Sequence, residues 1–162
     1  MDIFAPDPQY LGYVSPRLND TAEDLASSHL ETATPVKLYF PEGEVDFIVS
    51  TPLTKRPTTV ETVLGRRVRV DTTAEIIAKK VWHRGPELTA RDMFDLALVA
   101  AKEPAALDEI AGVLRSRRDA IRSRIASGVQ ALRKTYSELD TLDFRPSFDE
   151  CVRAVVELLD RS

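Results

Sequence analysis

Charged side chains interrupt two otherwise apolar helices predicted between residues 74 and 101, and they are the first candidates for chemistry in this chain. On a helical wheel started at Ala74, Lys80 falls between Ile76 and Ile77, so Lys80 is expected to face the core or a cleft. The polar side of the wheel holds Glu75, Lys79 and His83. We expect Lys79 to be exposed.

The second of these helices carries three charges in its first turns, Arg91, Asp92 and Asp95. Almost every other side chain from Met93 to Ala101 is apolar, which is typical of a buried helix. Because buried charges are costly without partners, Lys80 is expected within ion-pair distance of Asp92 or Asp95. Two interpretations stay open: a buried ion-pair cluster that joins two helices, or a site that faces a polar ligand.

A further acidic candidate, Asp46, lies in a predicted strand. Between residues 44 and 50, Val45, Phe47 and Val49 share one face, and Asp46 lies on the other face with Ile48. Asp is depleted in strands, so this position is unusual. Asp46 is therefore a candidate for a site on the side of the strand opposite to the valines.

Two sequence motifs carry a resemblance to a known family. The chain reads E-I-x-A-x-K at residues 75–80, followed by a short basic loop and R-D-x-x-D-L-A at residues 91–97. Upstream it reads GEVDFIVSTPLT from Gly43 to Thr54. These segments resemble the C-terminal signature of the AbiEii/AbiGii-type nucleotidyltransferase toxin family, which belongs to the polymerase-beta-like nucleotidyltransferase superfamily.

The resemblance implies transfer of a nucleotide from a nucleoside triphosphate to an acceptor such as tRNA, and a cognate antitoxin as partner. Such transfer uses carboxylates that converge on Mg²⁺. Asp2 and Asp46 are then expected to bind the metal. Asp46, Lys80 and Asp92 are expected to act in catalysis, and Lys80, Arg91 and Asp95 to contact the nucleotide.

The first residues of the chain match only part of the family's metal-binding motif. Asp2-Ile3-Phe4 resembles the end of a D-x-D-h-F strand, with Met1 between the two acids. The first acid and the Gly-Ser turn before it are not found. We therefore expect either a start upstream of Met1 or a truncated family member, with weak Mg²⁺ and nucleotide binding by these 162 residues.

Composition places the chain among ordinary globular proteins. Its 162 residues are 43% hydrophobic and 30% charged, which predicts a single domain with a sizeable core. The net charge of −4 argues weakly against a protein that coats nucleic acid. Cys151 has no internal partner for a disulfide and is expected in the core. A free cysteine, together with a sequence that shows no signal peptide or membrane span, indicates a cytoplasmic protein.

The pattern of elements predicts an α+β fold with a small, mainly antiparallel sheet at residues 1–71 and a helical part at residues 72–162. Strands are expected at 36–40, 44–50 and 66–70, and the first two are joined by a hairpin. Helices are expected at 21–30, from Thr72, from Thr89, from Pro104 to about Ser127, and from Ser147, with a break or a kink at Gly128 before a further helical piece to about Leu139.

Two alternatives to an enzyme remain. The chain could be a non-catalytic remnant that binds a partner through its helices. It could also be an RNA-binding module that uses the arginines at positions 115, 117, 118, 122 and 124, of which Arg115, Arg118 and Arg122 share one helix face, although a solvated face is the more frequent explanation. His29 and His83 have no spacing for zinc and are expected at the surface, and Trp82 is expected in the core.

Overall fold

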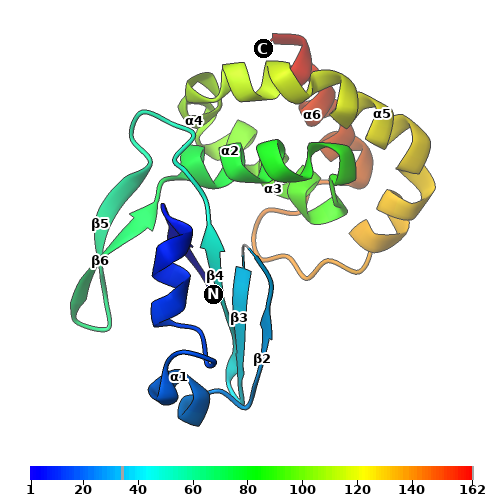
Figure 1. Ribbon diagram of the computed structural model, residues 1–162. Helices are drawn as coiled ribbons and strands as arrows, with labels where there is room; N and C mark the ends of the chain where they lie inside the picture. The colour runs from blue at the N-terminus through cyan, green and yellow to red at the C-terminus, as the bar shows by residue number, and fades with distance from the viewer. Residues whose placement is uncertain (34, 162) are drawn as a thin grey trace. The chain divides into compact units, whose positions relative to one another are not determined.

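The computed structural model describes residues 1–33 and 35–161 (Figure 1). The chain divides into two compact units, Met1–Pro52 and Leu53–Ser162, and each is described by itself. The predicted α+β class is confirmed, because the strands precede a wholly helical segment that begins at Thr73. Among the described residues, no helix is long and apolar enough to cross a membrane.

The first unit is built on a four-stranded sheet with the strand order β1-β4-β3-β2. Strand β1 runs parallel to β4, and the other two pairs are antiparallel. The elements are β1 (Asp2–Ala5), η1 (Pro8–Tyr13), α1 (Asp20–Leu25), β2 (Ser28–Glu31), β3 (Pro35–Phe40) and β4 (Gly43–Val49).

One face of this sheet forms the small core of the first unit. Val36 and Leu38 of β3 pack with Leu11 of η1, and Phe47 and Val49 of β4 add to them. Since successive side chains of a strand point to opposite faces, the residues between these positions lie on the other face. The alternation of β4 therefore separates its apolar side from the side that carries Asp46, as the sequence predicts.

The predicted hairpin is present, with β3 and β4 joined around Glu42. Gly43 has φ +146°, a backbone conformation that favours glycine. The predicted helix at residues 21–30 is wrong in its second half: α1 ends at Leu25, and residues 28–31 pair with β3 as strand β2. Pairing along an open sheet edge outweighs local helix propensity here.

The second unit begins with a two-stranded hairpin, β5 (Thr58–Val63) and β6 (Arg66–Asp71). The turn contains Leu64 at φ 50° and Gly65 at φ 76°. Strand β6 matches the prediction at 66–70, whereas β5 was not predicted. The helices that follow are α2 (Thr73–Arg84), η2 (Gly85–Glu87), α3 (Ala90–Lys102), α4 (Pro104–Glu109), α5 (Ala111–Tyr136) and α6 (Phe148–Arg161).

These helices share one hydrophobic core. Val81 of α2, Met93 of α3, Leu114 of α5 and Leu159 of α6 are all fully buried in it. Cys151 is also buried, as predicted, and its Sγ lies 3.2 Å from the Tyr136 hydroxyl. The core fixes α2 and α3 against each other, and these are the two helices that carry the candidate charges.

The predicted break at Gly128 is wrong. Helix α5 runs unbroken through Gly128, and the interruption lies at Ile110, between α4 and α5. Ile110 is 1% exposed, and its N–H donates to the carbonyl of Leu107 at 3.2 Å. The interruption therefore lies at a residue with non-helical backbone angles, φ −107° and ψ 11°, whereas a single glycine costs a helix only about 1 kcal/mol.

Candidate functional site

Two candidate groups of charges are present, one in each unit. In the first unit, the parallel pairing of β1 with β4 places Asp2 in register with Asp46. The antiparallel pairing of β3 with β4 places Lys37 in register with Asp46 from the other side. Since residues in register share a face of the sheet, all three side chains rise from the face opposite to the core. We call these residues, together with Glu44 of β4, the strand-acid group.

Lys37 neutralises part of this group. Its Nζ lies 3.0 Å from Asp46 Oδ2 and 3.0 Å from Glu44 Oε1. Hydrogen bonding to Glu44 and then to Asp46 raises the pKa of Lys37 above its ordinary value of 10.5. Lys37 therefore stays protonated, and it fixes the orientation of the Asp46 carboxylate.

The second oxygen of Asp46 is left without a partner. Asp46 Oδ1 is buried and has no hydrogen-bond partner among the described residues. Buried polar atoms in proteins nearly always have one, so an unpaired carboxylate oxygen calls for a ligand or a functional explanation. Asp2, its exposed neighbour in register, adds a second carboxylate on the same face.

This donor set fits the way in which Mg²⁺ is held in proteins. Mg²⁺ usually takes one or two carboxylates and completes its shell with water and substrate phosphates. Asp2 and Asp46 supply two carboxylates, and Asp46 Oδ1 is unpaired. In the part of the chain that the structure describes, no three His, Cys, Asp or Glu side chains are grouped so that they could hold a metal. The remaining ligands would therefore be water and substrate phosphates.

In the second unit, Lys80 of α2 reaches two acids of α3. Its Nζ lies 2.5 Å from Asp95 Oδ2 and 3.5 Å from Asp92 Oδ1. The prediction that Lys80 pairs with Asp92 or Asp95 is confirmed. Arg84 approaches the same oxygen of Asp92 at 3.4 Å, whereas Arg91 is exposed on α3. We call Lys80, Arg84, Asp92 and Asp95 the helix-charge group.

Asp92 has a structural task as well. It forms a capping box with Thr89 at the start of α3, in which its Oδ2 accepts from the Thr89 backbone N–H at 3.1 Å and from the Thr89 hydroxyl at 2.7 Å. The side chain is 1% exposed. The threonine three residues before the acid fixes this carboxylate locally, and Lys80 and Arg84 then neutralise its charge.

The prediction that Lys79 is exposed is wrong. Lys79 is 8% exposed, and its Nζ lies 2.6 Å from Asp71 Oδ2 and 3.6 Å from Glu75 Oε1. Glu75 is fully buried. The polar arc of α2 is covered by the end of β6 and by residues 53 and 54, while Ile76 is 44% exposed instead. The wheel identified the polar side correctly but not what packs against it.

Glu75 is the residue that sequence reasoning undervalued. Its carboxylate accepts hydrogen bonds from the backbone N–H groups of Leu53, at 3.0 and 3.1 Å, and Thr54, at 2.9 Å, and from the Thr54 hydroxyl at 2.7 Å. Both partners of this contact lie in the quoted motifs, Glu75 in E-I-x-A-x-K and Thr54 at the end of GEVDFIVSTPLT. Their joint presence was the signal that could have predicted it.

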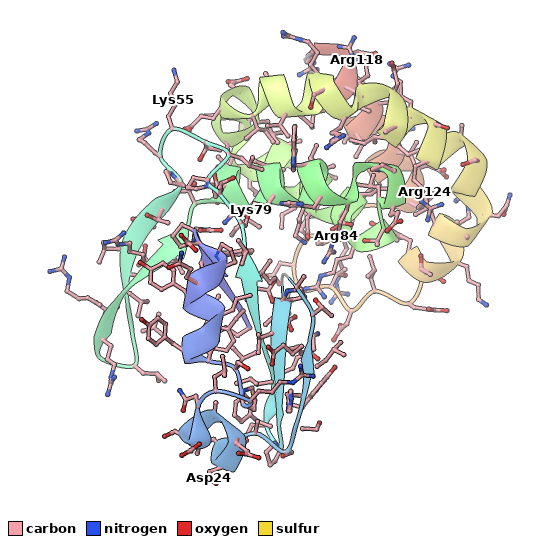
Figure 2. The ribbon with its side chains drawn as sticks, in the orientation of Figure 1. Asp24, Lys55, Lys79, Arg84, Arg118 and Arg124 are labelled. Atoms are coloured by element: carbon pink, nitrogen blue, oxygen red, sulfur yellow. The ribbon has the colours of Figure 1, made fainter. Side chains whose placement is uncertain are left out.

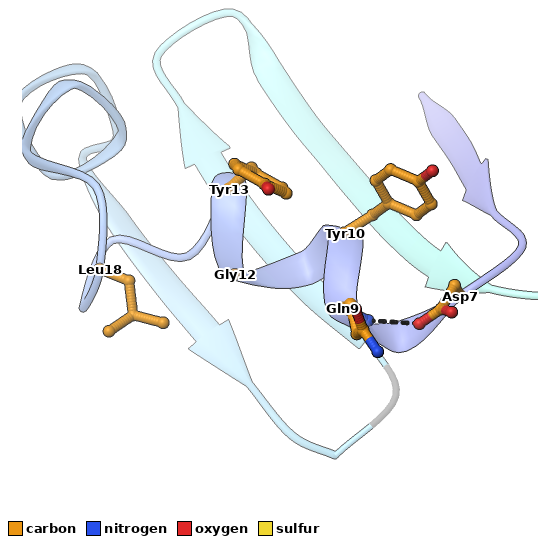
Figure 3. A pocket seen from close by; sticks show the side chains of 6 residues that line it. All are labelled: Asp7, Gln9, Tyr10, Gly12, Tyr13 and Leu18. Atoms are coloured by element: carbon orange, nitrogen blue, oxygen red, sulfur yellow. Dashed lines mark hydrogen bonds between the residues drawn. The ribbon is translucent and has the colours of Figure 1, made fainter.

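A shallow pocket in the first unit contains none of the predicted site residues (Figure 3). It is lined by Asp7, Gln9, Tyr10, Gly12, Tyr13 and Leu18. The Asp7 carboxylate accepts from the Gln9 backbone N–H at 2.8 Å and so caps η1. The two tyrosine rings lie 6.5 Å apart at 40°. Asp7 therefore serves as the cap of η1.

Comparison with known proteins gives one result that bears on the fold. A crystal structure described as that of a "putative nucleotidyltransferase from H. pylori" matches with a TM-score of 0.50 and 15% sequence identity, covering 99% of this chain and 75% of that chain. No protein-family model matches the chain, and no curated protein matches it. The chain therefore has a nucleotidyltransferase-like fold.

Proposed function

We propose that this protein is a nucleotidyltransferase of the AbiEii toxin type, which transfers a nucleotide from a nucleoside triphosphate to an acceptor such as tRNA. The observation that carries the proposal is the pairing of Asp2 with Asp46 in register on one sheet face, in a chain with a nucleotidyltransferase-like fold. Two carboxylates on adjacent strands are what a metal-dependent transfer requires.

Asp2 and Asp46 would hold Mg²⁺. When bound, the metal supplies charge neutralisation for the triphosphate oxygens. Asp46 suits this role because its Oδ1 is unpaired, while its Oδ2 is held at 3.0 Å by Lys37. Lys37 therefore acts as a positioning residue that presents one oxygen of Asp46 for binding.

In the second unit, the helix-charge group would supply a cation for the phosphates of the nucleotide. Lys80 is the cation for this task, since its side chain is 26% exposed. Asp95 and Asp92 hold its ammonium in place, and the exposed Arg91 offers a second cation near the start of α3. A fixed ammonium stabilises developing phosphate charge without reorganising during the reaction. A cognate antitoxin and a cytoplasmic location are part of the same proposal.

A second candidate, a non-catalytic module that only binds a partner, has an observation in its favour. Lys80, Asp92 and Asp95 already pair with one another, so this cluster satisfies its own charges. Such a pattern is also typical of ion pairs that join two helices. The two candidates differ in whether Lys80 is needed for catalysis or for stability.

The test is nucleotide transfer by the protein expressed from its complete reading frame. It would be incubated with Mg²⁺, each labelled nucleoside triphosphate and total tRNA. We expect Asp46→Asn and Lys80→Met to lower the rate by on the order of 10²-fold or more. Glu42→Gln is the matched control, because Glu42 is an exposed acid in the turn between β3 and β4 and lies outside the strand-acid group, so its rate should stay within a few-fold of the parent.

Two results would contradict the proposal. If Asp46→Asn and Lys80→Met label the acceptor as fast as the parent protein, the catalytic acids and the phosphate-facing lysine lie elsewhere. If the parent protein labels no acceptor with any nucleotide, while its folding is intact by circular dichroism, the binding module is the better explanation.

A further inference from the structure

An exposed tryptophan lies at the end of α2, stacked on an arginine of α5. Trp82, the single tryptophan of the chain, is 39% exposed, so the prediction that it belongs to the core is wrong. The Arg117 guanidinium carbon lies 4.3 Å from the centre of the indole ring. A guanidinium on an indole face gains cation–π attraction, and the pair forms a flat, positively charged surface.

Close packing against Gly85 holds this stack in place. A Cβ at Gly85 would lie 3.3 Å from the Arg117 Cβ, so the arginine stem passes closely over the glycine. Arg117 Nε is buried and has no hydrogen-bond partner among the described residues. The positive charge of Arg117 is therefore presented beside Trp82 without a carboxylate that neutralises its Nε.

The same flank of α5 carries a second arginine. Arg124 follows Arg117 by two helical turns and donates from Nε to the Leu88 carbonyl at 3.2 Å. Figure 2 shows Arg124 and Arg84 below α5, and Arg118 above it. We call Trp82, Arg84, Arg117 and Arg124 the Trp82 strip.

The acids near this strip do not cancel its charge. Asp92 faces Arg84 but is 1% exposed and also neutralises Lys80. Glu87 of η2 is exposed next to the strip and contributes one negative charge. The strip thus contains three arginines beside these two acids, and Asp92 is shared with Lys80. The net charge of the strip is therefore positive.

The opposite flank of α5 is less suitable for a polyanion, although the sequence had pointed to it. Arg122, on the face with Arg115 and Arg118, pairs with Asp160 of α6. Trp82, the single tryptophan of the chain, lies against Arg117 and therefore on the other flank. Aromatic surface beside arginines is the feature that distinguishes a nucleic-acid-binding face from a merely solvated one. The flank with Trp82 has this feature.

We propose that the Trp82 strip binds a single-stranded nucleic acid, with a base stacked on the Trp82–Arg117 pair and the backbone phosphates along the arginines. Single strands suit this surface because their bases are available for stacking, whereas those of a duplex are not. The proposal deepens the proposed function, on which it rests for the role of the strand as acceptor.

The single tryptophan makes the test specific. Titrating the protein with oligouridylate or oligothymidylate should quench the Trp82 emission, at the same concentrations at which a labelled oligonucleotide gains fluorescence anisotropy. Affinity should fall steeply as salt rises, since arginine–phosphate contacts release counterions. The RNA and DNA arms tell which sugar is preferred. Binding without a change in Trp82 emission, or no binding at low salt, would overturn the proposal.

Variants on the two flanks sharpen the result. Arg117→Gln and Trp82→Ala should each raise the dissociation constant about fivefold or more, because stacking of one base on an aromatic side chain contributes at least about that factor. Arg115→Gln, on the opposite flank of the same helix, should change it less than about twofold. If Arg115→Gln weakens binding as much as Arg117→Gln, or if duplex RNA competes as well as a single strand, stacking on Trp82 is excluded.

These measurements contain no triphosphate, so they separate the two proposals. Strand binding by a protein that transfers no nucleotide would leave the Trp82 strip intact and contradict the proposed function. Nucleotide transfer by a protein whose Trp82 emission is unaffected by any strand would contradict the strip and leave the proposed function standing.

Discussion

The strand-acid group of the first unit and the charges around α2 in the second unit differ in how fully their polar atoms are paired. Glu75 is fully buried and accepts hydrogen bonds from Leu53 and Thr54 as well as an ion pair from Lys79. Asp46, in contrast, has one oxygen on Lys37 and one without a partner among the described residues. A fully paired buried charge stabilises its surroundings, whereas a half-paired one still has capacity for a ligand.

The same contrast separates two adjacent lysines of α2. The Lys79 side chain is 9% exposed and bridges Asp71 and Glu75, which ties the end of β6 to the helix. The Lys80 side chain is 26% exposed and reaches Asp95, itself 25% exposed. Lys79 therefore belongs to the packing of the second unit, and Lys80 has access to solvent and to a ligand.

The largest expected effect is the loss of stability when the fully paired carboxylate of Glu75 is removed. Glu75→Ala leaves two backbone N–H groups and Lys79 without their carboxylate, and removing one partner of a buried charged network typically costs about 3–5 kcal/mol. We expect the free energy of unfolding, measured in urea by circular dichroism, to fall by that order. Glu87→Ala, an exposed acid of η2, is the control and should change it by less than about 0.5 kcal/mol. Similar values for both variants would show that Glu75 is not a structural centre.

The two lysines sharpen the comparison with smaller effects. Lys79→Met should lower the free energy of unfolding by about 1–3 kcal/mol, because buried Glu75 loses its cation. Lys80→Met should lower it by less than about 1 kcal/mol, since Asp95 can turn to solvent and Asp92 keeps Arg84 and Thr89. Nucleotide transfer should follow the opposite order, with Lys80→Met the more damaging. If Lys80→Met proves the more destabilising change, the helix-charge group is structural.

The sequence alone predicted the helical second half well and the sheet incompletely. Capping signals at Thr72 and Thr89 gave the starts of α2 and α3, because a cap is a local interaction between residues three apart. Strands β2 and β5 were not predicted, since each exists through pairing with a strand that the local pattern does not reveal. The break at Ile110 was likewise not predicted, since no glycine or proline marks that position.

The candidate site shows the same division. Pairing of Lys80 with Asp95 could be predicted because both positions follow from helical periodicity on neighbouring helices. The register of Asp2 with Asp46 could not, because register depends on which strands are neighbours. The predicted exposure of Lys79 was wrong. A helical wheel assigns polar residues to solvent, and it cannot show that Lys79 forms ion pairs with Asp71 and Glu75.

Exposed charge pairs at the start of α6 are expected to contribute less to stability than either group above. Arg133 of α5 donates to both oxygens of Asp149, at 3.2 and 2.6 Å, and its guanidinium lies 4.6 Å from the centre of the Phe148 ring. Glu150 accepts from the Ser147 hydroxyl and backbone N–H, at 2.7 Å each. Both carboxylates are exposed, so their contribution to stability is screened by water.

The smallest expected effect is therefore an acid-dependent loss of stability at α6. Hydrogen bonding to Arg133 lowers the pKa of Asp149 from its ordinary value of 3.8, and hydrogen bonding to Ser147 lowers the pKa of Glu150 from 4.5. A pKa that is lower in the folded state contributes stability above the unfolded value, and this contribution is lost as pH falls through the folded value. The thermal unfolding midpoint should thus fall as pH drops from above 4.5 to below 3.8, and less steeply in Asp149→Asn and Glu150→Gln. Glu138→Gln, an exposed acid beyond the end of α5, should retain the full pH dependence. Equal slopes in all four proteins would mean that these exposed pairs of α6 contribute nothing measurable to stability.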